Sequence, residues 1–254
     1  MSTHTIFLPD LRTRALSAPA GSPASVSGAG ARLLIGGEEA HHALRVKRLE
    51  TGDRVRFCDG RGGVAEGTIA ETRKERRSGE WQFDADCGPV EVTPPDAPRL
   101  RVWSGVPKGD GLGQMIDGLS QVGATGWAPL VSARTIVEPR EGKLRRLERV
   151  AEEAIKQCGR SWLLEIGEGW ELAQVLDAGG TLIAADVSGD EYTRTGAEAL
   201  GLLIGPEGGW DPRELALMRS RGVRIARFGP HVMRVEVAAV VGAALVMQSE
   251  RAVR

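Results

Sequence analysis

From Arg99 onward the chain alternates short apolar runs with helical segments, and this alternation constrains the fold more than any other feature of the sequence. The apolar runs occupy 99–106, 126–133, 181–187, 200–205 and 223–228, and helical segments separate most of them. Parallel strands need long crossover connections, which are usually helices. The order therefore predicts an α/β fold with a parallel sheet that helices cover on both faces.

The helix between the last two runs has the clearest boundaries. Asp211 is a favourable N-cap residue, Pro212 occupies the first helical position, and Glu214 completes a capping box. Gly222 is placed to end this helix. A later apolar segment, 237–247, is about half as long as a membrane span, so it predicts a buried helix.

The first part of the chain has a different pattern. Runs with β character occur at 32–36, 53–60, 63–70 and 81–87, with a short helical segment at 38–46. Small and polar residues at 15–30 predict a flexible loop. Three prolines at 92–98 disrupt strands and helices, so they predict a linker. We therefore expect a small β-barrel domain at 1–95 and an α/β domain at 96–254.

The composition limits the class of protein. Of the 254 residues, 41% are hydrophobic and 26% are charged, which is typical of a soluble globular protein. The net charge of −1 gives no global support for a nucleic-acid partner, so that argument has to be local. Cys58, Cys87 and Cys158 form no CxxC pair, which suits a reducing cytoplasm and argues against zinc. The N-terminus lacks a run long enough for a signal peptide, so we expect a cytoplasmic protein without membrane or metal partners.

The stretch LLIGPEGGWD at 202–211 places three glycines, a proline and a glutamate directly after an apolar run. Ligands of open parallel sheets bind beyond the carboxyl ends of the strands, and glycines let a ligand approach the main chain. The patterns G-x-G-x-x-G and G-x-x-x-x-G-K-[ST] are both absent from this turn, which disfavours NAD and nucleoside triphosphates. A tight strand-to-helix turn without a ligand explains this segment equally well.

A second segment, FGPHVMRVEVAAV at 228–240, again places Gly-Pro after a strand. It continues through an arginine and a glutamate into an apolar helix. If the two strands are neighbours in the sheet, the two Gly-Pro loops lie side by side and form a slot lined by main-chain groups. This repetition favours a binding site over a simple turn.

These two loops, IGPEGG at 204–209 and FGPHVMRVE at 228–236, resemble the motifs of the RsmE family. Similar runs are KGD at 108–110, GATGWAPLVSAR at 123–134, KQCGR at 156–160, HHALRVKRLETGD at 41–53 and DGRGG at 59–63. That family belongs to the SPOUT superfamily and methylates N3 of a uridine in small-subunit (16S) ribosomal RNA.

The resemblance implies a SPOUT-type α/β domain with a deep trefoil knot, preceded by a PUA-like β-barrel domain that binds RNA. It also implies a homodimer, S-adenosyl-L-methionine as cofactor, and ribosomal RNA in an assembled or partly assembled particle as substrate. Periodicity alone predicts an unknotted sheet, because threaded chains are rare.

The resemblance places the cofactor against the loops at 204–209 and 228–237. A flat, largely apolar adenine suits a slot of main-chain amides and aliphatic side chains. The expected cofactor-binding residues are Leu203, Ile204, Gly205, Pro206, Glu207, Gly208, Gly209, Phe228, Gly229, Val232, Met233, Val235, Val237 and Ala238.

Methylation at N3 of a pyrimidine requires loss of a weakly acidic proton, and therefore a base or a donor to the ring oxygens. Arg234 and Glu236 are the expected catalytic residues. Arg234 is suited to stabilise the charge on O2 or O4, or to hold the target phosphate. Two explanations for Glu236 are equally good: it acts as the base, or it forms a buried ion pair with Arg234. Glu207 could cap N–H groups of its own turn.

RNA recognition requires local positive charge. The expected RNA-binding residues are Arg45, Lys47, Arg48, Arg134 and Arg160. A solvated basic face is the alternative explanation for the cluster at 41–56, and a helix-end charge is the alternative for Arg160.

Two departures from the family pattern keep other functions open. The family usually has Arg-Thr-Glu-Thr-Ala where this chain has Val235 and Val237 in place of the threonines, and Lys and Glu where it has Gly118 and Gln121. Valine matches threonine in shape but lacks the hydroxyl. The alternatives are an RNA-binding ribosome assembly factor of the same fold with weak or no catalysis, and an enzyme of this fold acting on another RNA group such as a ribose hydroxyl.

Overall fold

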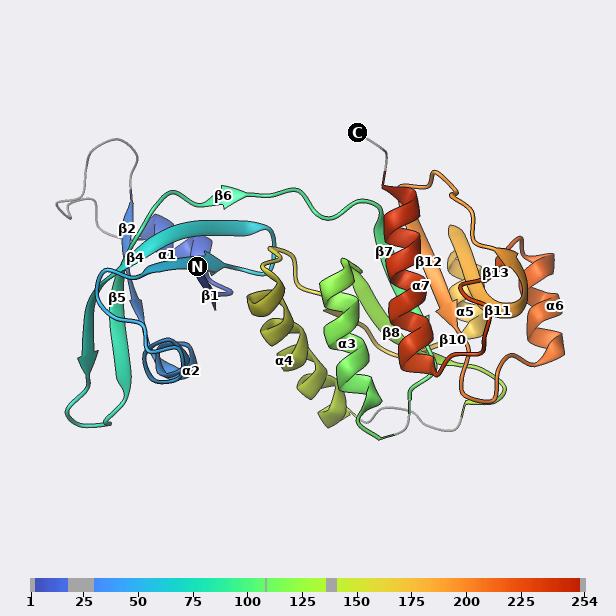
Figure 1. Ribbon diagram of the computed structural model, residues 1–254, viewed down its shortest axis with the longest axis horizontal. Helices are drawn as coiled ribbons and strands as arrows, with labels where there is room; N and C mark the ends of the chain where they lie inside the picture. The colour runs from blue at the N-terminus through green and yellow to red at the C-terminus, as the bar shows by residue number, and fades with distance from the viewer. Residues whose placement is uncertain (1–2, 18–29, 108, 136–140, 252–254) are drawn as a thin grey trace. The chain divides into compact units, whose positions relative to one another are not determined.

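The computed structural model describes residues 3–17, 30–107, 109–135 and 141–251. The chain forms two compact units (Figure 1): unit 1 comprises Met1–Pro95 and Ile155–Trp162, and unit 2 comprises Asp96–Ala154 and Leu163–Arg254. Most of the loop predicted at 15–30 lies outside the described residues. Its first three residues were predicted wrongly, because they form the end of helix α1 (Leu11–Ser17).

Unit 1 contains a six-stranded sheet in the order β1-β3-β4-β5-β2, with β6 paired to β4. Its strands are β1 (His4–Phe7), β2 (Ala31–Ile35), β3 (Arg54–Cys58), β4 (Gly63–Lys74), β5 (Trp81–Cys87) and β6 (Glu91–Val92). The four predicted strands are confirmed as β2 to β5. The segment predicted as a short helix forms α2 (Gly37–His41) and the π-helical turn η1 (His42–Val46). Phe57 and Phe83 are fully buried in the core of this unit.

A late segment of the chain, 155–162, completes unit 1. The indole N–H of Trp162 donates to the carbonyl of Thr93 at 3.0 Å, and the N–H of Gly62 donates to the carbonyl of Ser161 at 2.8 Å. Lys156 forms an ion pair with Glu39 at 2.8 Å. The domain limits expected from the proline-rich linker do not include this segment.

Unit 2 is built on a seven-stranded sheet in the order β10-β8-β7-β12-β11-β13, with β9 paired to β8. The strands are β7 (Arg99–Ser104), β8 (Gly126–Val131), β9 (Glu165–Ile166), β10 (Trp170–Glu171), β11 (Thr181–Glu191), β12 (Ala199–Ile204) and β13 (Arg224–Arg227). The helices are α3 (Gly111–Val122), α4 (Glu141–Cys158), α5 (Leu172–Ala178), α6 (Pro212–Ser220) and α7 (Val235–Glu250). The strand pairings are parallel, so the predicted parallel α/β sheet is confirmed. The trefoil knot stays a prediction.

Alternate side chains of β12 enter two cores, one on each face of this sheet. Leu202 and Ile204 pack in a cluster with residues of α3 and α7, which lie side by side on one face (Figure 1). Leu203 packs in the other cluster with residues of α5 and α6. Burial on both faces explains why this strand reads as a continuous apolar run rather than an alternating one.

Helix α7 is only partly buried, although the sequence predicts a buried helix. Val235 and Val246 are buried in the core, but Val237 and Leu245 are 44% and 42% exposed. Val241, one turn from each of them, is half-buried. These three side chains have a four-residue spacing, so they form one apolar stripe along the helix.

The last residue of α7 anchors a loop. The side chain of Glu250 is 1% exposed, and its carboxylate accepts hydrogen bonds from the Tyr192 hydroxyl at 2.5 Å and from the N–H and hydroxyl of Thr195. It also accepts from the N–H of Gly196 at 2.8 Å. Burial alone would raise the pKa of Glu250, but these hydrogen bonds outweigh burial and hold the pKa below its usual value.

We expect Glu250→Gln to lower the free energy of unfolding by about 2 kcal/mol at neutral pH, because an amide cannot accept from all these donors. The lowered pKa means that the native carboxylate stabilises the fold above its usual pKa of 4.5. This stabilisation is lost as the pH falls through the lower native value. In urea unfolding, the difference in unfolding free energy between Glu250→Gln and the original protein should therefore shrink on acidification. Gln248→Ala is the control and should change the unfolding free energy little. A difference that is constant with pH would contradict this.

Candidate functional site

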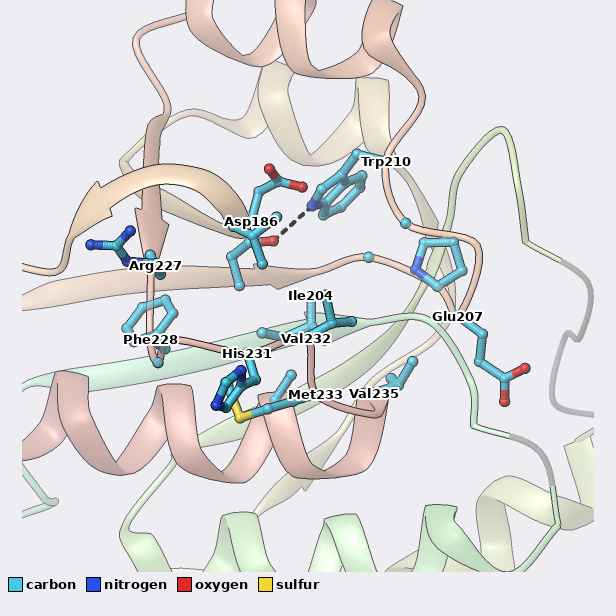
Figure 2. Close-up of a pocket in the computed structure, with 17 residues that line it drawn as sticks. Asp186, Ile204, Glu207, Trp210, Arg227, Phe228, His231, Val232, Met233 and Val235 are labelled. Atoms are coloured by element: carbon cyan, nitrogen blue, oxygen red, sulfur yellow. Dashed lines mark hydrogen bonds between the residues drawn. The ribbon is translucent and has the colours of Figure 1, made fainter.

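A cavity of about 220 Å³ lies at the carboxyl ends of β12 and β13 and beside the middle of β11 (Figure 2). Its lining comes from 185–187, 204–210 and 227–238. Both Gly-Pro loops line it, as the sequence predicts. Their strands are not neighbours, however, because β11 lies between β12 and β13 and adds its own residues to the cavity.

The glycine-rich turn is closed by a hydrogen bond from the N–H of Gly209 to the carbonyl of Pro206 at 2.8 Å. Gly209 has a φ of +68°, which a residue with a side chain adopts only with strain. Pro206 rests against Gly105, which follows β7, so closely that a Cβ atom on Gly105 would lie 2.7 Å from the Cα of Pro206. Gly105 could not be predicted as a site residue, because a single glycine after a strand carries no signal of its own.

Trp210 forms one wall of the cavity and is 5% exposed. Its indole N–H donates to the carbonyl of Ala185 at 3.0 Å, which joins the turn after β12 to the middle of β11 (Figure 2). A Cβ atom on Gly205 would lie 3.0 Å from this indole. A glycine at this position therefore allows the indole to close the cavity on that side.

The second loop supplies an apolar wall. Phe228 is 7% exposed and stacks on Tyr192 with a distance of 5.4 Å between the ring centroids. The Tyr192 hydroxyl donates to Glu250, so the hydrogen bonds at Glu250 also fix this wall of the cavity. Val235 is buried, whereas Val232 is 84% exposed at the cavity and available to a ligand.

Four polar side chains border the cavity: Asp186, Glu207, Arg227 and His231 (Figure 2). One carboxylate oxygen of Asp186 accepts from the N–H of Ser188 at 2.9 Å. Sequence reasoning missed three of the four, Asp186, Arg227 and His231. The available signal for Asp186 was a carboxylate inside the apolar run 181–187, and this residue lies within β11.

Most of the expected cofactor-binding residues meet at this cavity. Its lining includes Ile204, Gly205, Pro206, Glu207, Gly209, Phe228, Gly229, Val232, Met233, Val235 and Ala238. Three others are not part of the lining. Leu203 is buried in the core beside Trp210, Gly208 faces Arg134, and Val237 lies on the exposed side of α7.

Arg234 and Glu236 lie at the start of α7, next to the cavity but outside its lining. Arg234 is the N-cap residue and is exposed. Glu236 is half-buried, and its carboxyl carbon lies 3.2 Å from the place where a Cβ atom on Gly111 would sit. Among the ion pairs of the described part of the chain, none joins Arg234 to Glu236.

The expected RNA-binding residues fall into separate places. Arg45, Lys47 and Arg48 are exposed together in unit 1, and Arg160 is half-buried in the late segment of that unit. Arg134 belongs to unit 2.

Arg134 braces the glycine-rich turn. Its guanidinium donates to the carbonyl of Gly208 at 2.8 Å and lies 3.5 Å from the carboxylate of Asp211. The neighbouring Ala133 N–H donates to Glu214, whose other carboxylate oxygen accepts from the N–H of Asp211. The loop after β8 is thus tied to the turn and to the predicted capping box of α6, which is confirmed.

Within residues 3–17, 30–107, 109–135 and 141–251, no group of His, Cys, Asp and Glu side chains is arranged to hold a metal ion. No helix in these ranges has the length and apolar character needed to cross a membrane. Burial raises the pKa of the Cys58 and Cys87 thiols to about 11, which disfavours their reactive thiolate forms.

The chain matches two family models. Residues 95–247 match the RNA methyltransferase domain, and residues 35–76 match the RNA methyltransferase PUA domain. The chain belongs to the RNA methyltransferase domain family. The predicted PUA-like front domain is confirmed by the second match.

Curated relatives and a solved structure agree with this family. The chain is 29% identical over 235 residues to ribosomal RNA small subunit methyltransferase E of Synechocystis, covering 81% of this chain and 69% of that protein. It is 25% identical over 225 residues to the protein of the same name from Bacillus subtilis, covering 80% and 85%. The fold matches that of a ribosomal RNA small subunit methyltransferase E from Neisseria gonorrhoeae bound to S-adenosyl methionine, with a TM-score of 0.78, 19% identity and 96% coverage of both chains. The resemblance to the RsmE family is confirmed.

The structure explains part of the departures from the family pattern. A Cβ atom on Gly118 would lie 2.7 Å from a methyl carbon of Val240, so glycine allows α3 and α7 to pack closely. Gln121 donates to Asp117 within α3 at 2.8 Å. Val235 fills the cavity wall, whereas Val237 points away from the lining, so only the first of the two valines removes a hydroxyl from the cavity.

We expect Gly205→Ala to destabilise the protein by about 1–2 kcal/mol, because the added methyl group must displace a buried, hydrogen-bonded indole. Gly229→Ala is the matched control, since its Cβ atom would meet only the flexible end of Met233 at 3.8 Å. Urea unfolding should leave the control within about 0.5 kcal/mol of the original protein. Equal losses of unfolding free energy in the two variants would contradict the proposed role of Gly205.

Proposed function

We propose that the chain is an S-adenosyl-L-methionine-dependent methyltransferase that modifies N3 of a uridine in small-subunit (16S) ribosomal RNA. The observation that carries the proposal is that both Gly-Pro loops line one cavity at the carboxyl ends of the parallel strands β12 and β13. The family match and the names of the relatives support the same reaction class.

The residues present suit the cofactor. Ile204, Phe228 and Val235 offer an apolar surface for a flat adenine ring, and main-chain groups of both loops are close enough to recognise its edge. The lining also contains the carboxylate of Asp186, which suits the donors of a ribose or an ammonium group. The space beside Gly229 is open except for the end of Met233, so a ligand has room there.

The cofactor, when bound, supplies an electrophilic methyl group on a sulfonium. The chain has to hold the uridine ring so that N3 faces that methyl group, and to assist departure of the N3 proton. Arg234 is exposed next to the cavity, so its guanidinium can stabilise charge on O2 or O4 of the ring or hold the target phosphate. Glu236, half-buried beside Gly111 and next to the cavity, is the carboxylate that we assign as base.

Several further features belong to the proposal. The RNA is held in part by Arg45, Lys47 and Arg48 of unit 1, in an assembled or partly assembled particle. The protein acts in the cytoplasm without a metal ion. It works as a homodimer, for which the exposed apolar stripe of α7 is the candidate interface.

The rival function is a ribosome assembly factor of the same fold with weak or no catalysis. Val235 favours this rival, because it removes a hydroxyl from the cavity wall. The rival predicts RNA binding without methyl transfer.

We expect calorimetry to show binding of S-adenosyl-L-methionine to the original protein and loss of this binding in Gly229→Leu, whose side chain would extend into the open space at the cavity. Gly113→Leu, at another open glycine position, is the control for a general effect of the substitution. Mass spectrometry of ribosomal RNA from a deletion strain should then show one N3-methyluridine missing, restored by the original gene but not by the Gly229→Leu gene. Absence of cofactor binding would favour the assembly factor, and an intact N3-methyluridine would exclude the proposed target.

We expect Leu245→Glu to shift the protein from dimer to monomer in light scattering after gel filtration, because a charge within an apolar interface is costly. Leu217→Glu on α6 is the control, since Leu217 is 40% exposed but lies away from the stripe. A dimer that survives Leu245→Glu would place the interface elsewhere.

A further inference from the structure

Unit 1 has its own hollow, of about 580 Å³, next to Trp81. It is bordered by Gly37, Glu38, His41, Gly79, Glu80 and Trp81. Gly37 and Gly79 have φ values of +64° and +72°, and a Cβ atom on Gly37 would meet nothing within 4 Å. The rim is therefore bare of side chains at these glycines, which leaves the indole accessible from the hollow.

Two cations accompany this indole. The guanidinium carbon of Arg45 lies 5.5 Å from the ring centroid, and the ammonium of Lys74 lies 5.8 Å from it. Lys74 is the cross-strand partner of Trp81 in the β4–β5 pairing. Cations at these distances are attracted to the ring face. The result is an aromatic ring with positive charge held over it.

The backbone that presents Arg45 is unusual. Arg45 belongs to the π-helical turn η1, and Arg48 has a φ of +58°. Isolated π-helical turns and left-handed residues other than glycine occur frequently at functional sites. Here they keep Arg45, Lys47 and Arg48 exposed within four residues of one another.

The charges decide what fits the hollow. Glu38 and Glu80 border it and would repel a phosphate, whereas the basic residues lie at the indole and beyond η1. An uncharged flat ring suits the hollow, and a phosphate backbone suits the basic residues. Single-stranded RNA carries both groups, and proteins bind it by stacking bases on aromatic or guanidinium planes.

We propose that Trp81, with Arg45 and Lys74 beside it, is a stacking platform for an unpaired base of the RNA substrate. The platform takes the base in the hollow bordered by His41, while Arg45, Lys47 and Arg48 contact the flanking phosphates. This proposal rests on the proposed function only in taking RNA as the partner of unit 1.

The test uses the full-length protein and two labelled probes, an oligouridine and an abasic ribose-phosphate oligomer of the same length. The original protein should bind oligouridine more tightly than the abasic oligomer. Trp81→Leu keeps an apolar side chain against the core of unit 1 but cannot stack. We expect it to weaken oligouridine binding roughly tenfold, to the level of the abasic oligomer, without changing the dependence on salt. Trp81→Phe should retain most of the affinity.

Lys47→Ala provides a contrasting variant, because Lys47 is exposed and loss of its phosphate contact should weaken binding of both probes and reduce the salt dependence. Equal binding of the two probes by the original protein, or unchanged oligouridine binding by Trp81→Leu, would overturn the platform. Calorimetry with S-adenosyl-L-methionine on Trp81→Leu should match the original protein. Failure of the original protein to bind that cofactor would instead count against the proposed enzyme and leave the RNA measurements valid.

Discussion

Two glycines at the carboxyl edge of the unit 2 sheet permit close packing that a side chain at either position would block. Gly105 makes room for Pro206, and Gly205 makes room for Trp210. Both contacts shape the turn after β12, and Trp210 then reaches across to the carbonyl of Ala185 on β11. The cavity therefore depends on tight packing of the turn against two neighbouring strands.

The two loops of the cavity are also held by groups far away in the sequence. Arg134, on the loop after β8, bonds the carbonyl of Gly208 in the first loop. Glu250, at the end of α7, holds Tyr192, which stacks on Phe228 of the second loop. Fixed positions of both loops are what a methyl-transfer site requires, because small errors in alignment are costly to the rate. The supporting residues do not themselves line the cavity.

Much of the fold and site could be predicted from local patterns. Apolar runs, the capping box at Asp211 and the two Gly-Pro loops predicted five of the seven strands of the second sheet, helix α6 and most of the cavity lining, whereas the two-residue strands β9 and β10 were missed. The order of the strands could not be predicted this way, because pairing is set by contacts between distant residues. For that reason β11 was not expected between β12 and β13, and Asp186 was missed. The resemblance to a known family, rather than periodicity, supplied the reaction class.

Arg134 shows a second limit of sequence reasoning. Its charge and position favour an RNA contact, yet its guanidinium bonds the glycine-rich turn. Arginine serves both roles, so the RNA contact of Arg134 stays a prediction beside this structural role. The exposed stripe of α7 could not be predicted from the sequence either. The helix is apolar on nearly all sides, so its sequence does not indicate which side the core leaves uncovered.

Helix α4 contributes to both compact units, and this has a consequence for biosynthesis. Unit 1 consists of Met1–Pro95 together with Ile155–Trp162, and the later segment provides partners for Glu39, Gly62 and Thr93. During translation, the front unit therefore cannot complete its fold until residue 162 has left the ribosome. A gene fragment that ends at the proline-rich linker would encode an unfinished module, so exchange of this module between proteins requires the distant segment to travel with it.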